Sequence, residues 1–447
     1  MTTTNTTGLY KFLRDSAITF SQRILSLVFG FIVSVILART LGKSGVGVLT
    51  LVLLFPSMTV TFVNFGVPAA TVYLVGSRKY TLSEAVFNNL VVSLFLSALG
   101  IIGAMLALVL FKAYIFSSVD TRYLYWALLI IPFNLIGSNL RILFQALSNF
   151  KLFSLLTVFP LFFNTVVFVW LFFFGNITVL LALWTTILSS MFSLILVIYF
   201  LSKYVSLDSF ERKLHFGYLK DSINYGWKNY ISSVFTFFNY KQDRFLLNAY
   251  LSPASVGVYN VGANFGEKLW MVSQSVSTVL FPKIASLEDN EAQRRWMTPF
   301  IARHIFTGTA ILALILFFLT PTLIHLLYGD EFRNAATVLR IILPGVVFLT
   351  LARIVSNDIA GRGHPGVNTI LSGISLVINL TANILLIPEF GVFGAAWAST
   401  ISYTADALLK VSVYSYIAKV SWLDVFFLRL SDFQVWQRLA RSLKSKS

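Results

Sequence analysis

Long hydrophobic stretches alternate with short polar turns along almost the whole chain. Each stretch has roughly 20 residues or more, which is the length that an α-helix needs to cross about 30 Å of hydrocarbon. The pattern predicts an all-α polytopic membrane protein with about 12 transmembrane helices. The expected spans are 17–38, 46–70, 85–111, 123–146, 152–174, 178–200, 224–250, 255–281, 301–321, 335–358, 365–387 and 391–416.

The amino-acid composition agrees with a membrane protein and limits which kinds of functional site the chain can have. The chain is 57% hydrophobic and 12% charged, whereas a soluble domain averages about 25% charged residues. It has no cysteine, which excludes disulfides, thiolate metal ligands and cysteine catalysis. Its four histidines are widely dispersed, and no large polar loop carries paired carboxylates. We therefore expect no metal site, no cofactor and no enzymatic activity.

The net charge of +16 follows from basic residues on one side of the membrane. Lys and Arg gather at the N-terminus, in the turns after even-numbered spans and in the C-terminal tail. Because cytoplasmic loops carry an excess of Lys and Arg, we expect both termini in the cytoplasm. The charge therefore indicates a multi-pass protein of the cell (cytoplasmic) membrane that contacts anionic headgroups, and not a nucleic-acid-binding protein.

The two halves of the chain resemble each other. Three pairs of similar stretches recur about 210–213 residues apart in the same order: 37–49 with 243–259, 145–151 with 358–364, and 173–186 with 388–400. The longest polar stretch, Ser202–Tyr225, separates six expected spans from six. We predict a duplication, with the substrate site at the interface between the halves. The expected parts are an N-terminal six-helix lobe (1–201), a cytoplasmic linker (202–223), a C-terminal six-helix lobe (224–417) and a cytoplasmic amphipathic tail (418–447).

Charged and amide side chains interrupt several hydrophobic stretches. A charge at membrane depth is costly, so it usually lines a water-filled cavity or a substrate path. Suppose that the substrate moving along this path is a lipid pyrophosphate that carries a sugar. Guanidinium and ammonium groups would then bind its phosphates, and amides would contact the sugar. Carboxylates would bind a coupling cation or gate the path. Candidate pyrophosphate contacts are Arg23, Lys241, Arg244 and Lys268; candidate coupling or gating residues are Asp243, Glu267 and Asp406; candidate sugar contacts are Asn64, Asn239, Asn260, Asn264 and Gln274.

Each of these residues also has a purely structural interpretation. The adjacent pairs Asp243–Arg244 and Glu267–Lys268 point about 100° apart on a helix, so both members of a pair do not face one cavity. One member then pairs with a neighbouring helix or the headgroups, and Arg244 lies near a helix end from which it can snorkel. The asparagines fit interhelical hydrogen bonds of roughly 0.6 kcal/mol each.

Four stretches resemble the Wzx-type polysaccharide and oligosaccharide flippases of the multidrug/oligosaccharidyl-lipid/polysaccharide (MOP) exporter superfamily. They are 37–48 (LARTLGKSGVGV), 144–150 (FQALSNF), 243–259 (from Asp243-Arg244 to Val258-Tyr259) and 279–285 (VLFPKIA). The resemblance implies a MATE-like fold of two six-helix lobes around a central cationic cavity. It also implies that the protein translocates a polyprenyl-pyrophosphate-linked oligosaccharide from the cytoplasmic to the outer leaflet by alternating access.

The same resemblance leaves one alternative and several partners open. An ion-coupled multidrug or cation antiporter of the superfamily is the alternative, although Asp15 lies only at the edge of the first span. The chain has no ATP-binding module, so a proton or sodium gradient, the membrane potential or the cargo gradient must drive transport. Membrane lipids and a polysaccharide polymerase or glycosyltransferase are the further expected partners.

Overall fold

The computed structural model describes residues 3–205, 213–270, 273, 280, 284 and 290–432. Over these ranges every regular element is a helix, which confirms the expected all-α class. Gln274 and the tail from 433 onwards lie outside the described residues.

The chain divides into two compact units. Unit 1 comprises 1–237, 244–260 and 327–331, and unit 2 comprises 238–243, 261–326 and 332–447. Helix α8 (Phe216–Tyr250) therefore contributes six residues to unit 2 and the others to unit 1. The predicted lobes 1–201 and 224–417 follow a different division and stay a prediction.

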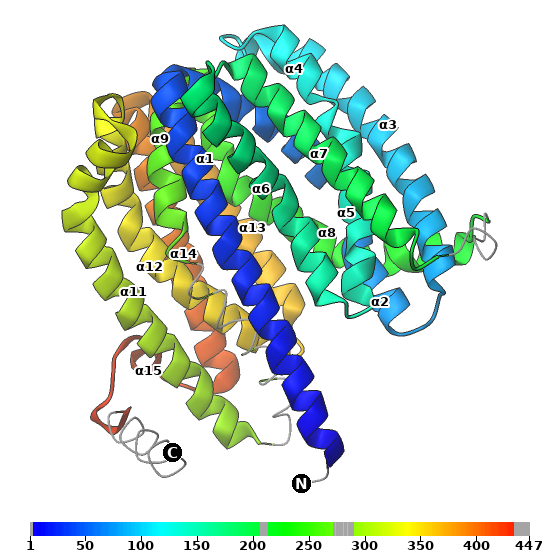
Figure 1. Ribbon diagram of the computed structural model, residues 1–447. Coiled ribbons are helices and arrows are strands. Elements are labelled where there is room, and N and C mark those ends of the chain that lie inside the picture. The colour runs from blue at the N-terminus through cyan, green and yellow to red at the C-terminus, as the bar shows by residue number, and fades with distance from the viewer. Residues whose placement is uncertain are drawn as a thin grey trace. The chain divides into compact units, whose positions relative to one another are not determined.

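Unit 1 is a bundle in which α1 packs along α6, and α3, α6 and α7 pack on α5 (Figure 1). Besides most of α8, its helices are α1 (Thr3–Val63), α2 (Val67–Gly76), α3 (Leu82–Ile115), α4 (Thr121–Ala127), α5 (Ile130–Ala146), α6 (Phe150–Phe174), α7 (Val179–Leu201) and the first half of α9 (Pro253–Glu267).

Unit 2 is built on α14, which packs against both α12 and α13. Its elements are the second half of α9, most of α11 (Glu291–Tyr328), α12 (Arg333–Gly361), α13 (Pro365–Phe390), α14 (Val392–Ala418) and the short α15 (Trp422–Phe426). The 3₁₀ turn η2 (Asp330–Phe332) precedes α12.

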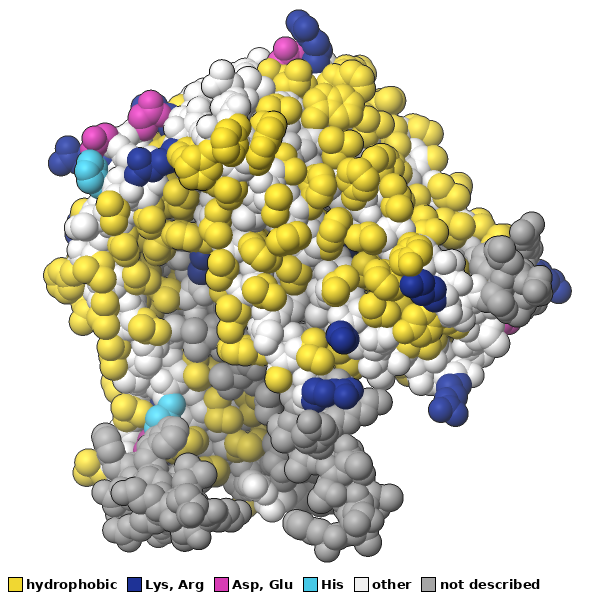
Figure 2. All heavy atoms as spheres, in the orientation of Figure 1, with side chains coloured by type: hydrophobic (Ala, Val, Ile, Leu, Met, Phe, Trp, Pro, Cys, Tyr) yellow, Lys and Arg dark blue, Asp and Glu magenta, His cyan; other side chains and the backbone are white. Residues whose placement is uncertain are grey.

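Within the described residues, eight helical segments are long and apolar enough to cross a membrane. Many hydrophobic side chains lie on the face seen in Figure 2. The exposed hydrophobic side chains of the described residues include Val109, Phe174 and Phe318. Such a surface suits a hydrocarbon environment. The eight segments are 17–63, 82–115, 121–146, 150–174, 179–201, 291–328, 330–361 and 365–390; α8, α9 and α14 are not among them.

Several predicted boundaries were wrong. The first two predicted spans are separated as expected, because the non-helical backbone of Gly42 divides α1 into two helices at a kink. The second of them, predicted to reach residue 70, ends at Val63. Phe65 and Gly66 take positive φ there, which stops the helix, and α2 begins with Pro68 in its first turn. Helix α8 starts at Phe216, inside the predicted linker.

The turn after α5 recurs after α12. The Asn149 amide donates to the Phe144 carbonyl at 2.8 Å, and the His364 amide donates to the Ile359 carbonyl at 3.1 Å. Ser148 and Gly363 take the positive φ that this Schellman-type C-cap requires. These positions lie 215 residues apart, against 213 for the predicted pair 145–151 and 358–364. Such caps end many helices, so the repeat stays a prediction.

Two glycines from the similar stretches meet within unit 1. A Cβ on Gly47 would overlap the Pro253 carbonyl, and a Cβ on Gly257 would overlap the Lys43 carbonyl. Because 210 residues separate 43 from 253 and 47 from 257, the contact is self-complementary in the way of a two-fold interface. Glycine at both positions lets the two helix starts approach backbone to backbone.

A polar cluster joins α8 to the turn between α2 and α3. Lys79 Nζ lies 2.7 Å from Asp221 Oδ2, and the Tyr80 hydroxyl donates to the same oxygen at 2.8 Å. The hydrogen bond from Lys79, with that from Tyr80, holds the pKa of Asp221 below its usual value. Burial, with the hydrogen bond to Asp221, raises the pKa of Tyr80 to about 12.

The close backbone contact at Gly47 and Gly257 leads to a prediction about stability. Gly257→Ala should lower the thermal unfolding temperature in detergent, because overpacking costs typically about 1–3 kcal/mol. Gly308→Ala in α11 is the matched control, since a Cβ there meets nothing within 4 Å. Equal unfolding temperatures for the two variants would contradict the crossing.

The Asp221 cluster makes a pH prediction. Since the folded pKa of Asp221 is below the unfolded value, its stabilisation is present above about pH 4 and is lost as pH falls through the lowered pKa. The difference in unfolding temperature between wild type and Asp221→Asn should therefore be constant from about pH 8 to 5 and shrink at lower pH. Asp120→Asn is the control, and a difference that does not change with pH would count against the cluster.

Candidate functional site

Arg23 lies on α1 inside the first candidate span. Its Nη1 atom is buried and has no hydrogen-bond partner. The neighbouring Gln22 is engaged, because Ser154 Oγ on α6 donates to Gln22 Oε1 at 3.2 Å. An arginine inside a membrane helix is costly, by up to about 2.5–3.5 kcal/mol at the helix centre on insertion scales. An unpartnered guanidinium nitrogen in that setting is typical of a binding site.

A second membrane-embedded arginine, Arg141 on α5, is a residue that sequence reasoning missed. Its Nη1 donates to the Leu156 carbonyl of α6 at 3.4 Å. That carbonyl would normally accept from the amide of residue 160, but residue 160 is Pro160 and has no N–H. Arg141 thus caps a free carbonyl with one of its five N–H groups.

Both arginines belong to the place where α1, α5 and α6 meet. Helices α1, α5 and α6 are in mutual contact. Gln22, next to Arg23, binds Ser154, and Arg141 binds Leu156 two residues later on α6. Two residues along a helix correspond to about 3 Å of rise, so Gln22 and Arg141 contact the same turn of α6, while Arg23 points about 100° away from Gln22 around α1.

The other predicted residues of unit 1 are more fully engaged. Arg244 is 1% exposed, its Nε donates to Asn260 Oδ1 at 3.1 Å, and its guanidinium lies 5.5 Å from the centre of the Tyr259 ring. Two candidate residues are therefore brought together as a hydrogen-bonded pair. Asn64 follows α1, and its Oδ1 is buried without a partner.

In unit 2, Lys241 and Glu267 form an ion pair with Nζ and Oε2 3.5 Å apart. The Lys241 side chain is 31% exposed and the Glu267 side chain is 18% exposed, so water can reach the pair. Trp270 lies close by, with its ring 5.0 Å from that of Tyr240. Arg353, which sequence reasoning also missed, lies 5.1 Å from the centre of the Trp270 ring.

Amide and hydroxyl groups tie α8 to α13 and α14 in unit 2. Ser402 Oγ donates to Asn239 Oδ1 at 3.1 Å, and Gln242 donates to Asn379 at 2.5 Å. Asn239, Gln242 and Asn379 are buried. Asn239, a predicted sugar contact, is thus part of an interhelical network of the kind that its structural interpretation describes.

Asp406 pairs with Lys410 one turn further along α14, with Oδ2 and Nζ 2.7 Å apart. Its Oδ1 is buried without a partner. Asp243 is 2% exposed, while Lys268 and Asn264 are partly buried. The roles predicted for these residues stay predictions, as does that of Gln274, which lies outside the described residues.

Some charged residues of the membrane spans have an oppositely charged partner and others do not. Glu267, Asp358 and Asp406 each have a basic partner. In contrast, Arg23, Arg141 and Arg353 make no ion pair with any carboxylate in the part of the chain that the structure describes. Arg141-Ile142 and Arg353-Ile354 lie 212 residues apart, so the repeat offset is the signal that would have found both.

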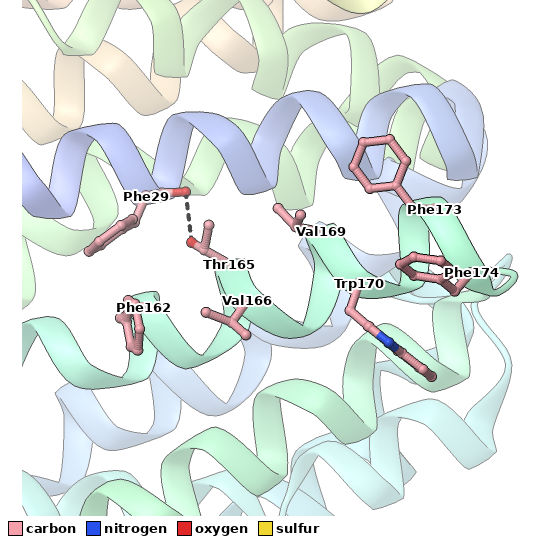
Figure 3. Close-up of a pocket in the computed structure, with 8 residues that line it drawn as sticks. All are labelled: Phe29, Phe162, Thr165, Val166, Val169, Trp170, Phe173 and Phe174. Carbon is pink, nitrogen blue, oxygen red and sulfur yellow. Dashed lines mark hydrogen bonds between the residues drawn. The ribbon is translucent and has the colours of Figure 1, made fainter.

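An apolar groove lies between α1 and α6, with a volume of about 390 Å³. Figure 3 shows Phe29 of α1 facing Phe162 of α6, and the Thr165 hydroxyl donating to the Phe29 carbonyl. The lining has no charged residue: Phe29, Phe162, Thr165, Val166, Val169, Trp170, Phe173 and Phe174. This groove therefore offers contacts to hydrocarbon and none to an anion.

The chain resembles solved membrane transporters in fold. An inward-facing multidrug resistance MATE family transporter of the MOP superfamily superposes with a TM-score of 0.72 and 15% identity, covering 90% of this chain and 98% of the other. The lipid II flippase MurJ, in an inward closed conformation, gives a TM-score of 0.72 at 16% identity, covering 94% and 89%. The expected MATE-like fold is confirmed.

Sequence relatives point in the same direction. The probable low-salt glycan biosynthesis flippase Agl15 of Haloferax volcanii is 23% identical over 225 residues, which are 48% of this chain and 47% of that protein. The match spans less than half the length of each curated relative. A family model described as polysaccharide biosynthesis protein matches residues 12–288. This multi-pass membrane protein of MATE-like fold therefore belongs to the polysaccharide biosynthesis protein family.

Proposed function

We propose that this protein flips a lipid-pyrophosphate-linked oligosaccharide from the cytoplasmic to the outer leaflet of the cell membrane. The observation that carries the proposal is the set of arginines at membrane depth that lack an acidic partner: Arg23, Arg141 and Arg353. A pyrophosphate supplies the negative charge that these guanidinium groups need, and each guanidinium can bind two phosphate oxygens at once.

The family and the relatives support this class of cargo. The family is one of polysaccharide biosynthesis, Agl15 is named as a flippase of glycan biosynthesis, and the structurally similar MurJ is a flippase of lipid II. A cationic drug would be repelled by the same arginines, so the antiporter alternative is less well supported. Transport, and not catalysis, is the activity that we assign.

The route that we propose is a cationic cavity lined by residues of the repeats, which opens alternately to each side. Twelve membrane helices and cytoplasmic termini complete this arrangement. In this arrangement Arg23 lies in the cytoplasmic half of the membrane, where the cargo enters. Trp270 and Tyr240, beside Arg353 and Lys241, are suited to stack on sugar rings, since aromatic faces pair with apolar and cationic groups.

Coupling is the second part of the proposal. Glu267 lies in an ion pair with Lys241 that is partly exposed, so a proton or a sodium ion can compete with the lysine for the carboxylate. Asp406 has one buried oxygen without a partner, and Asp243 is the third candidate. A polysaccharide polymerase or a glycosyltransferase on either side would consume or supply the cargo.

The test is a flipping assay with the purified chain in liposomes that contain a lipid-pyrophosphate-linked oligosaccharide. The amount of cargo that becomes accessible to an external sugar-modifying enzyme is followed with and without pH and sodium gradients. Arg23→Gln should slow the flipping by about 10-fold or more, because hydrogen bonds to charged groups contribute about 1.5–3 kcal/mol.

Arg122→Gln is the matched control, since the Arg122 side chain is 85% exposed and its only described ion pair is with Asp120. Its flipping rate should equal that of wild type. Unchanged flipping in Arg23→Gln would remove Arg23 from the site. No flipping by wild type, together with gradient-driven efflux of a cationic dye, would assign the chain to the antiporters.

A further inference from the structure

The short connection between α11 and α12 belongs to a different unit from the helices that it joins. The chain is part of unit 2 up to residue 326 and again from residue 332, whereas residues 327–331 are part of unit 1. The connection covers the end of α11 and the start of the 3₁₀ turn η2. The chain therefore enters unit 1 for five residues and then leaves it.

The connection and α1 cap free helix ends for each other. Glu331 Oε2 accepts a hydrogen bond from the Lys43 amide at 3.2 Å. That amide lies at the start of the second helix of α1, where amides lack helical partners and a negative charge is favourable. In return, Arg39 Nε donates to the Leu327 carbonyl in the last turn of α11 at 2.8 Å, where carbonyls lack partners. Gly42 leaves room for the carboxylate, since a Cβ there would lie 2.8 Å from Glu331 Oε2.

These contacts are of a kind that can break and form again. The hydrogen bonds of Glu331 and Arg39 lie at exposed positions, where water can replace either partner. Tyr328 adds a buried contact, because its side chain is 4% exposed and its hydroxyl lies 3.3 Å from Ser34 Oγ. Segments held by exposed hydrogen bonds and few apolar contacts open locally before the rest of a fold.

We propose that residues 327–331 form a latch on α1, which holds the outer side of the protein closed and releases when that side opens. The inference rests on the proposed function, because a cavity that opens alternately to each side needs contacts that break. In the proposed topology the latch lies on the outer side, since the kink at Gly42 follows the first span and the connection follows the ninth. The proposed function leaves open which contacts break, and the latch names them.

A reversible cross-link tests whether the latch must release during transport. The chain has no cysteine, so Lys43→Cys with Glu331→Cys supplies the only two thiols. A short bifunctional methanethiosulfonate joins them, and a reductant frees them. Flipping of a lipid-pyrophosphate-linked oligosaccharide by the full-length chain in liposomes should fall about 10-fold or more on cross-linking, because a conformational step is blocked, and should recover on reduction.

Asp120→Cys with Arg122→Cys is the matched control pair, since these two side chains form an ion pair within one short turn of unit 1. Treatment of this pair should leave the flipping rate unchanged. A Lys43–Glu331 cross-link that does not slow flipping would overturn the latch and leave the proposed function standing.

A labelling experiment tests the latch without any flipping. Ser34→Cys lies against Tyr328, and its rate of reaction with a membrane-impermeant thiol reagent reports release. Glu331→Ala should raise this rate about 3-fold or more, because it removes the acceptor of the Lys43 amide. Arg333→Ala, which removes an exposed charge two residues later, should not change it. If wild type does not flip the lipid and this difference is seen, the proposed function fails and the latch stands; equal labelling with and without Glu331→Ala would overturn the latch.

Discussion

The interior of a membrane has no water to satisfy polar groups, and this constraint organises both the fold and the candidate site. Every carbonyl or charge at that depth must find a partner in the protein or in the cargo. The fold shows how strictly this holds, because Pro160 and Pro321 each free one carbonyl and an arginine donates to each of them. The same rule makes a charge without a counter-ion informative.

The acidic residues and the arginines of the membrane spans differ in whether they have an oppositely charged partner. Glu267, Asp358 and Asp406 have basic partners within their own unit. Arg23 on α1 and Arg141 on α5 instead make no ion pair with a carboxylate among the described residues. Leaving a charge unpaired is unfavourable in low dielectric, and the function that we propose gives this positive charge an anionic headgroup as its partner.

Much of the architecture was predictable because hydrophobic length is a local property of the sequence. The helical class and the eight apolar segments of the described residues follow from it. The break at Phe65 and Gly66 did not, because an apolar window hides a turn whose only signals are Gly66 and Pro68. Asp406, a predicted coupling residue, forms an ion pair with Lys410 one helical turn later in the same segment, a spacing that the sequence already offers.

The site was harder to predict, since packing decides which polar residues meet. The charged cluster Lys241–Arg244 is conspicuous in the sequence, yet the Arg244 side chain donates a hydrogen bond to Asn260 and lies over the Tyr259 ring. Arg141 and Arg353 were missed because neither has charged neighbours, and only comparison of the two repeats sets them apart.

The central claim is that unpaired arginines of α1 and α5 receive the phosphates of the cargo. The most direct measurement is a cryo-electron microscopy map of the full-length protein in nanodiscs with a polyprenyl-pyrophosphate oligosaccharide. If these arginines bind the cargo, phosphate density is expected within about 3 Å of the Arg23 and Arg141 guanidinium groups, the distance of a charge-assisted hydrogen bond. Phosphate density elsewhere, with both arginines still unoccupied, would contradict it.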